Sequence, residues 1–290
     1  FWLSIVILLF TLPNFAQLRL PKLVSDGMIL QRDVKLNIWG WAKSNEAITI
    51  DFKGKTYHTV ANAEGEWKII LPEQKAGGPF EMQVKSGKEK ITLHDILIGD
   101  VWFASGQSNM ELPMRRVAPI YEDEIKTSKC TFIRQFFVPQ RYNFKQPEKD
   151  LPNGKWISAD PETVLDFSAV AYFFARNIYE KYKIPVGIIN ASLGGSPIQS
   201  WMSEEALKEF PSYYQEAQRF KNDDLIREIE QKDNERIAEW YRNLRQNDEG
   251  FQKDLPWFVP NIDTSDWLTM NIPGYWSNKY PEIQNGSVWF

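Results

Sequence analysis

Two nearly continuous apolar stretches constrain the fold of this chain more than any other feature of its sequence. ILIGDVWFA covers residues 96–104, and IPVGIINASLGG covers residues 184–195. Apolar runs of this kind are typical of strands buried on both faces of a parallel sheet. Between them, apolar side chains recur at helical spacing at Phe167, Val170, Ala171, Phe174, Ile178 and Tyr182. A further helix opens after the cap residue Ser203, so the order strand, helix, strand, helix predicts an α/β layered domain.

The regions on either side of this pattern have a different character. Residues 18–97 contain short stretches of alternating polarity, such as VKLNIWGWA and AITIDFKG, separated by turn residues, which predicts a small antiparallel β-sandwich. Residues 222–247 are highly charged with one apolar face, as expected of a surface helix. From about residue 263, short β-like pieces rich in Trp and Tyr return.

Composition excludes several classes of partner. A net charge of −4 over 290 residues gives no basic patch for nucleic acid or an acidic membrane surface, and the length suits about two domains. Cys130 is the single cysteine, so no disulfide forms within the chain. No cluster of His, Cys and carboxylates has the spacing of a metal site, and SLGGS lacks the Lys of a phosphate-binding loop. We therefore expect neither a metal nor a cofactor.

The first 17 residues are interpreted as a targeting segment. An apolar run from Phe1 to Leu12 is followed by Pro13 and the small-residue site NFA, a pattern typical of a secretory signal peptide. A membrane anchor is the alternative interpretation. Export together with a lone cysteine predicts a periplasmic or secreted protein that leaves the membrane after signal cleavage.

A serine follows the first apolar stretch at the point where a ligand would bind. In an α/β sheet, ligands bind beyond the carboxyl ends of the strands, and Ser108 in GQSNM lies just after such an end. A hydroxyl placed there can attack an ester carbonyl while its own N–H faces the developing oxyanion. The alternative is that Ser108 only caps the helix that follows.

Several separated motifs resemble one esterase family. DVWFAS, GQSNM, the opening LVSDGMILQRD with NIWGWA, and the later GIINASLGGSPIQSWMSEEAL are together similar to the bacterial sialate O-acetylesterases of the SGNH hydrolase superfamily. The resemblance implies an α/β fold with a flavodoxin-like α/β/α catalytic domain. It also implies a β-sandwich before that domain and the start of an inserted galactose-binding-like β module after it. The expected boundaries are 1–17 for the signal peptide, 18–97, 98–262 and 263–290.

The same resemblance implies roles for individual residues. Ser108 matches the nucleophile and contributes its N–H to the oxyanion hole, and one of Gly194 and Gly195 matches the glycine whose N–H joins it. The family's oxyanion Asn and its closing D-x-x-H pair have no match, so the catalytic His and Asp are expected beyond residue 290.

Other residues are candidates from position alone. Gln107 and Asn109 flank the serine and either hold the acyl group or brace the turn. Arg115 and Arg116 could meet a substrate carboxylate, although surface arginines are common. Asn190 is a candidate oxyanion donor, with a turn-stabilising role as the alternative. His58 and His94 are the two histidines, and both are interpreted as ordinary residues of the N-terminal strands and the linker after them.

The sequence thus predicts an esterase that removes O-acetyl groups from sialic acid through an acetyl-serine intermediate, with an acetylated glycan as its partner. An esterase acting on acetylated xylan is one alternative, and a noncatalytic glycan-binding protein is another. The oligomeric state does not follow from the sequence.

Overall fold

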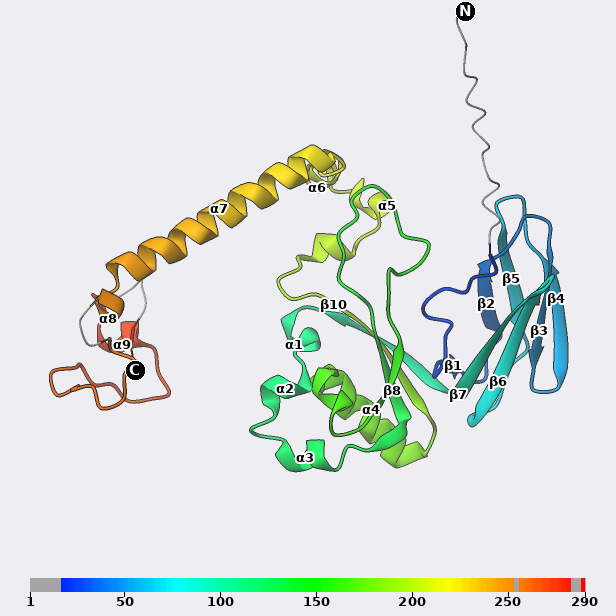
Figure 1. Cartoon of the computed structure of the whole chain (residues 1–290), viewed down its shortest axis with the longest axis horizontal. Helices are drawn as coiled ribbons and strands as arrows, with labels where there is room; N and C mark the ends of the chain where they lie inside the picture. The colour runs from blue at the N-terminus through cyan, green and yellow to red at the C-terminus, as the bar shows by residue number, and fades with distance from the viewer. Residues whose placement is uncertain (1–16, 253–255, 283–287, 290) are drawn as a thin grey trace, which may run out of the picture. The chain divides into compact units, whose positions relative to one another are not determined.

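The longest strand of the chain, β7 (Glu89–Gly106), runs through two differently built parts of one sheet. The structure is a computed structural model that describes residues 17–252, 256–282 and 288–289. Residues 89–98 of β7 pair with the antiparallel strand β6 (Gly77–Ser86), and residues 100–106 pair with the parallel strand β10 (Val186–Ser192). Figure 1 shows β7 running from the group of strands β2–β6 to the helices α1–α4. The predicted boundary between residues 97 and 98 therefore lies inside one continuous strand.

The N-terminal region is built of short, mostly antiparallel strands, as its alternating sequence predicts. Besides β6 these are β1 (Ile29–Gln31), β2 (Leu36–Trp41), β3 (Ala47–Phe52), β4 (Lys55–Val60) and β5 (Glu66–Leu71). β3 lies between β4 and β6, β2 and β5 form a separate pair, and β1 pairs in parallel with β7. Inward side chains of both sheets, such as Ile38, Ile50 and Leu71, share one hydrophobic core. The prediction of alternating strands is confirmed, whereas a separate β-sandwich domain stays a prediction.

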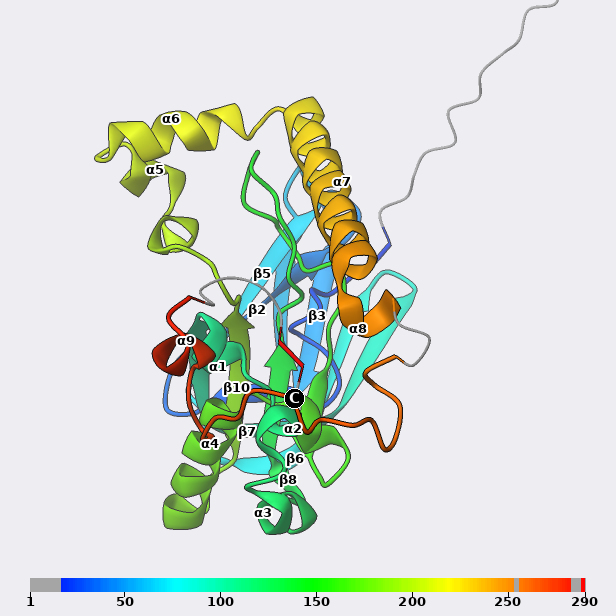
Figure 2. The same ribbon diagram turned by 90° about the vertical axis from the view of Figure 1, so that its left-hand side faces the viewer.

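The second part of the sheet has the parallel arrangement that the two apolar stretches predict. β10 lies between β7 and β8 (Cys130–Phe137) and is parallel to both, while β9 (Trp156–Ala159) is antiparallel to β8 at the edge. In the register of β7 and β10, Gly106 lies opposite Ser192, so the two strands end at the same level. Figure 2 shows these strands with the helix α4 (Ala169–Tyr182) beside them. The α/β class is confirmed.

The helix α4 covers one face of this parallel region. Its N-cap is Ser168, whose hydroxyl oxygen accepts the N–H of Ala171, and a second hydrophobic core lies between the helix and the strands. The predicted apolar face was partly wrong. The helix buries Ala169, Ala171, Tyr172 and Ala175, whereas Val170, Phe174 and Tyr182 are exposed. Because α4 carries apolar side chains on two sides, spacing alone does not identify the buried one.

One edge of the parallel region remains open. Among the described residues, residues 101–106 of β7 have a strand neighbour on one side only, which is β10. On this stretch the side chains of Trp102 and Phe103 are 47% and 66% exposed. Phe174 of α4 packs edge-to-face on Trp102, with 4.9 Å between ring centroids.

Short helices fill the connections between these strands and follow the last of them. They are α1 (Ser108–Glu111), α2 (Met114–Val117), α3 (Glu122–Lys126), the 3₁₀ turns η1 (Thr163–Asp166) and η2 (Ile198–Trp201), and α5 (Glu204–Leu207). The predicted cap of α5 is confirmed, because the Ser203 hydroxyl accepts the N–H of Ala206 at 3.1 Å.

Residues 211–290 form a second unit, separate from residues 1–210. It contains α6 (Pro211–Arg219), α7 (Asp223–Asn247), α8 (Glu249–Gln252) and α9 (Trp276–Lys279). The predicted surface helix is α7, which Asn222 caps and which buries none of its side chains. The short strands predicted from residue 263 are absent from the described residues there, which contain only α9. A galactose-binding-like module stays a prediction.

The predicted signal peptide falls on residues 1–16 and Gln17, and residues 1–16 lie outside the described part of the chain. Within the described part, no helix is both long enough and apolar enough to span a bilayer.

A buried arginine ties the N-terminal strands to the parallel region. Arg134 of β8 has a side chain that is 3% exposed. Its Nη1 donates to the carbonyls of Gly27 and Asp95, each at 2.6 Å, and its Nη2 donates to the Asp95 carboxylate at 2.9 Å. Its Nε donates to the Thr131 carbonyl. Loss of this buried guanidinium breaks four part-buried hydrogen bonds at once, which is costly.

We therefore expect Arg134→Met to lower the free energy of unfolding by about 3 kcal/mol in urea denaturation. Arg32→Met is the matched control. Arg32 is partly exposed and pairs with Asp100 at 2.8 Å, so its loss should cost about 1 kcal/mol or less. Equal losses in the two variants would contradict a joining role for Arg134.

A buried tyrosine makes stability depend on pH in the alkaline range. Tyr172 of α4 is 1% exposed and donates its hydroxyl to Glu124 of α3 at 3.0 Å. Burial, with a smaller effect of Cys130 and Glu180, raises the pKa of Tyr172 to about 12. An unfolded tyrosine ionises near pH 10. Between pH 10 and pH 12 the unfolded chain therefore loses a proton that the folded chain keeps.

The contribution of Tyr172 to stability is accordingly complete below pH 10 and is lost as the pH rises to 12. Wild type should lose about 2 kcal/mol more over this window than Tyr172→Phe, measured by urea denaturation at a series of pH values. Tyr182→Phe, which removes an exposed hydroxyl from the same helix, should follow the wild-type curve. Parallel curves for wild type and Tyr172→Phe would contradict the prediction.

Candidate active site

Ser108 lies at the carboxyl end of β7, as the sequence predicts. The strand ends at Gly106, whose φ of 147° suits glycine, and α1 begins directly at Ser108. The N-cap position belongs to Gln107, and no side chain caps this helix. The capping interpretation of Ser108 is therefore wrong. Ser108 is exposed, and neither its hydroxyl nor its N–H makes a hydrogen bond within the described residues.

The loop after β10 passes directly beside this serine. Leu193 donates its N–H to the Gly106 carbonyl at 3.0 Å, which continues the pairing of the two strands into the loop. A Cβ atom added at Gly194 would lie 3.7 Å from both Cα and Cβ of Ser108. The structure thus brings together the serine and the double glycine that the sequence singled out.

The two glycines differ in what their N–H groups do. The N–H of Gly194 donates to Oε2 of Glu111, the last residue of α1. Gly195 is exposed, and its N–H makes no hydrogen bond within the described residues. Its φ of 75° lies in the left-handed region that favours glycine. Of the two N–H groups, that of Gly195 is the one left open to a ligand.

The residues beside the serine have unequal roles. The side-chain amide of Gln107 donates to the carbonyl of Ser196, so Gln107 braces the glycine loop against α1. The Ser196 hydroxyl in turn accepts Nε1–H of Trp201 at 2.9 Å and donates to the Leu193 carbonyl. Asn109 is exposed and makes no contact of this kind within the described residues. The turn-bracing alternative is thus the one that the contacts of Gln107 favour.

The two arginines of α2 also differ. Arg115 forms an ion pair with Asp166 of η1. Arg116 is exposed and has no ion pair within the described part of the chain. Of the two, Arg116 is the one whose charge remains open to a substrate.

Two residues of the site were missed by sequence reasoning. Glu111 lies one turn after Ser108, and Gln140 follows the end of β8. Nε2 of Gln140 donates to Oε1 of Glu111 at 2.6 Å and to the carbonyl of Ser192 at 3.2 Å. A signal for Gln140 was present, because the segment CTFIRQFFV before it, which is rich in Phe and β-branched residues, forms a third strand whose carboxyl end meets the same edge of the sheet.

Buried polar side chains lie at the strand ends beneath the site. The Oε1 of Gln135 on β8 accepts the N–H of Ser168 at 3.0 Å and the side-chain amide of Asn190 at 3.4 Å. The Ser192 hydroxyl donates to Oδ1 of Asn190 at 2.7 Å. All four side chains belong to buried residues. Asn190 therefore connects the end of β10 to Gln135 on β8, which in turn binds the start of α4. These contacts give Asn190 a structural role, in place of the role of oxyanion donor.

Neither histidine lies beside Ser108. His94 is on β7, with Nδ1 3.3 Å from a carboxylate oxygen of Glu81. At about 3.3 Å per residue, the strand separates His94 from Gly106 by roughly 40 Å. His58 is on β4 at the far edge of the sheet, where Nδ1 lies 3.3 Å from the Thr49 hydroxyl. The two imidazoles belong to the N-terminal strands.

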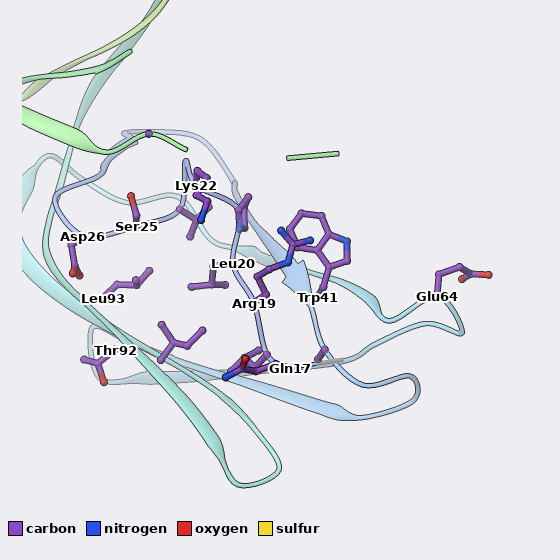
Figure 3. Close-up of a pocket in the computed structure, with 16 residues that line it drawn as sticks. Gln17, Arg19, Leu20, Lys22, Ser25, Asp26, Trp41, Glu64, Thr92 and Leu93 are labelled. Carbon is purple, nitrogen blue, oxygen red and sulfur yellow. The ribbon is translucent and has the colours of Figure 1, made fainter. Parts of the chain in front are cut away.

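A cavity of about 1040 Å³ lies in the N-terminal region, away from Ser108. Figure 3 shows the guanidinium of Arg19 lying over the ring of Trp41 on its wall, with 3.8 Å between the Arg19 Cζ and the ring centroid. Arg19 also pairs with Asp150 at 2.7 Å. Within the described residues, no three His, Cys, Asp or Glu side chains are grouped so that they could hold a metal ion.

The two glycines of the loop should respond differently to alanine. A Cβ at position 194 would lie 2.6 Å from Oε2 of Glu111, so in Gly194→Ala the carboxylate must move away. A Cβ at position 195 would meet nothing within 4 Å, so Gly195→Ala should leave Glu111 in place and cost about 1 kcal/mol through its positive φ. Crystal structures and urea denaturation of both variants check this. An unmoved Glu111 in Gly194→Ala would contradict it.

Comparisons with known proteins point to esterases. No family model matches the chain. The chain is similar to sialate O-acetylesterase of Homo sapiens, with 29% identity over 208 residues that cover 66% of this chain and 40% of the human protein. The rat enzyme of the same name, from Rattus norvegicus, is 29% identical over 211 residues, which cover 66% of this chain and 38% of that protein.

Among solved structures, the chain is similar to a carbohydrate acetylesterase from Xanthomonas citri. The two are 38% identical with a TM-score of 0.64, and the match covers 66% of this chain and 44% of the other. The chain spans about two fifths of the length of the curated relatives it matches. These similarities support a relationship to carbohydrate esterases.

Proposed function

We propose that this chain carries the nucleophile of a carbohydrate O-acetylesterase, and that the nucleophile is Ser108. The observation that supports this most directly is the place of Ser108: an exposed hydroxyl at the carboxyl end of β7, beside the Gly194–Gly195 loop. Ligands of α/β sheets bind at this end of the strands. The related proteins are named sialate and carbohydrate acetylesterases, which fits ester chemistry at such a serine.

In the proposed reaction, Oγ of Ser108 attacks the acetyl carbonyl and its proton passes to a base. The sugar hydroxyl leaves with a proton, and an acetyl-serine remains. Water then attacks the acetyl carbon, releasing acetate and restoring the serine. The N–H groups of Ser108 and Gly195, both without a partner within the described residues, would donate to the oxyanion. By the resemblance noted in the sequence, the base would be a histidine, and an Asn would be a further oxyanion donor.

We propose O-acetylated sialic acid as the substrate, the class that the curated relatives' names give. The open charge of Arg116, on the helix that follows the serine helix in the chain, would suit the carboxylate that distinguishes sialic acid from neutral sugars. A second candidate is an acetylated neutral polysaccharide such as xylan. The solved structure from Xanthomonas citri has a higher identity to this chain than the curated relatives above, and it is named only a carbohydrate acetylesterase. Rates of acetate release from acetylated sialic acid and from acetylated xylan distinguish the two.

We also propose that the protein is exported, on the basis of the signal-like pattern in residues 1–17.

Ser108→Ala, made in the protein expressed from its complete gene, should lower the turnover of 4-nitrophenyl acetate by about 10⁴-fold or more, because it removes the attacking oxygen. Ser105→Ala is the matched control. Ser105 is another exposed serine, three residues earlier on β7, and its loss should leave turnover within about twofold.

Mass spectrometry of quenched reactions adds a second readout, since the acetyl group should be found on Ser108. Near-normal turnover in Ser108→Ala would remove this serine from the mechanism. A wild-type protein without acetate release from any acetylated sugar would favour the noncatalytic glycan-binding alternative.

A further inference from the structure

The carboxylate of Glu111 lies where three segments of the candidate site meet. Glu111 belongs to α1, which begins at Ser108. Its Oε2 accepts the N–H of Gly194 in the loop after β10, and its Oε1 accepts Nε2–H of Gln140 in the loop after β8 at 2.6 Å. Gln140 is held a second time by its 3.2 Å bond to the Ser192 carbonyl. One side chain thus fixes the ends of two strands relative to the serine helix.

The chemistry of this contact requires an acceptor with two oxygens. Both partners of Glu111 are donors, and the same Nε2 of Gln140 also donates to the Ser192 carbonyl. A carboxylate accepts from both partners at once, whereas a glutamine amide offers one acceptor oxygen and one NH₂ group. Turning the Gln140 amide around does not help, because its oxygen would then face the Ser192 carbonyl. With an amide at position 111, at least one of the three bonds is lost.

The contact also determines which glycine N–H can donate a hydrogen bond to an oxyanion. The N–H of Gly194 is already used by Glu111, and a negative carboxylate beside it would oppose a developing oxyanion at that N–H. The N–H of Gly195, one residue further along the loop, stays without a partner within the described residues. Holding Gly194 in this way fixes the loop at the residue before the open donor.

We propose that Glu111 is a positioning residue of the esterase site: it holds the Gly194–Gly195 loop against Ser108, so that the Gly195 N–H faces the substrate carbonyl. The proposal rests on the proposed function for its catalytic consequence. Glu111 acts through the loop and does not touch the reacting atoms. Its loss should therefore disturb the transition state more than the binding of the substrate.

Kinetics of a graded series test this. In the protein from the complete gene, Glu111→Ala should lower kcat on an acetyl ester by about 10²-fold with KM within about threefold, because a misplaced donor costs this much. Glu111→Gln keeps two of the three bonds and should lose about tenfold. Glu122→Gln is the matched control, an exposed glutamate of α3 that pairs with Lys126, and its kcat should match wild type. A kcat for Glu111→Ala within twofold of wild type overturns the proposal.

Hydrogen exchange provides a readout that does not depend on activity. The Gly194 amide is bonded to Glu111, so a peptide covering residues 190–197 should exchange faster in Glu111→Ala than in wild type. Glu122→Gln should leave this peptide unchanged. Unchanged exchange in Glu111→Ala overturns the positioning role, even if the variant has lost activity.

The two readouts separate the two proposals. If wild type releases no acetate, the proposed function fails, and exchange alone still decides whether Glu111 holds the loop. If wild type is active and exchange rises without a loss of kcat, the loop is held by Glu111 but the site does not depend on it, and the positioning role is overturned.

Discussion

The fold of this chain depends on the continuity of one strand. Because β7 pairs with β6 at one end and with β10 at the other, a single backbone segment sets the register of the N-terminal strands and of the parallel region together. A slip of one residue would reverse its inward and outward side chains along both parts. Arg134 of β8 stabilises this connection, because its guanidinium donates hydrogen bonds to the carbonyls of Gly27 and Asp95. The position of Ser108 is thus determined by pairing at both ends of β7.

The candidate site shows how a short motif works through residues that lie far apart in the sequence. Ser108 and Glu111 come from the same turn of helix, whereas Gly194 and Gln140 come from loops after two other strands. Parallel strands bring these loops together because their carboxyl ends lie at one edge of the sheet. Below these loops, the buried side chains of Gln135 and Asn190 form a hydrogen bond with each other. The strand ends are thus connected by polar groups that have partners inside the core. The geometry favours a site whose parts are fixed before a ligand arrives.

The α/β region was the most predictable part of the fold from the sequence, because residues 96–104 and 184–195 are nearly continuous apolar runs, which are typical of parallel strands. The expectation that both faces of the first run are buried was wrong at its end, where Trp102 and Phe103 are exposed. Ser108 and the double glycine could be placed for the same reason, since they directly follow those strands. The contact between Glu111 and Gln140 could not be predicted, because it joins loops that are distant in the sequence, although the strand before Gln140 gave a signal for the position of Gln140. The buried face of α4 was misjudged because Tyr172 and Phe174 are both apolar and lie on different sides of the helix. From residue 263 the aromatic content suggested strands, yet aromatic residues favour burial in general rather than one backbone conformation.

The open side of β7 has a consequence for the behaviour of the chain in solution. Within the described structure, residues 102–106 have no strand partner on the side away from β10, and the exposed rings of Trp102 and Phe103 lie on the same stretch. Such an edge is a template on which another β-segment can add, from the same chain or from a second molecule. The strand that carries Ser108 to the site therefore also carries an edge that is open to pairing, and a charged substitution on that edge would disfavour such pairing.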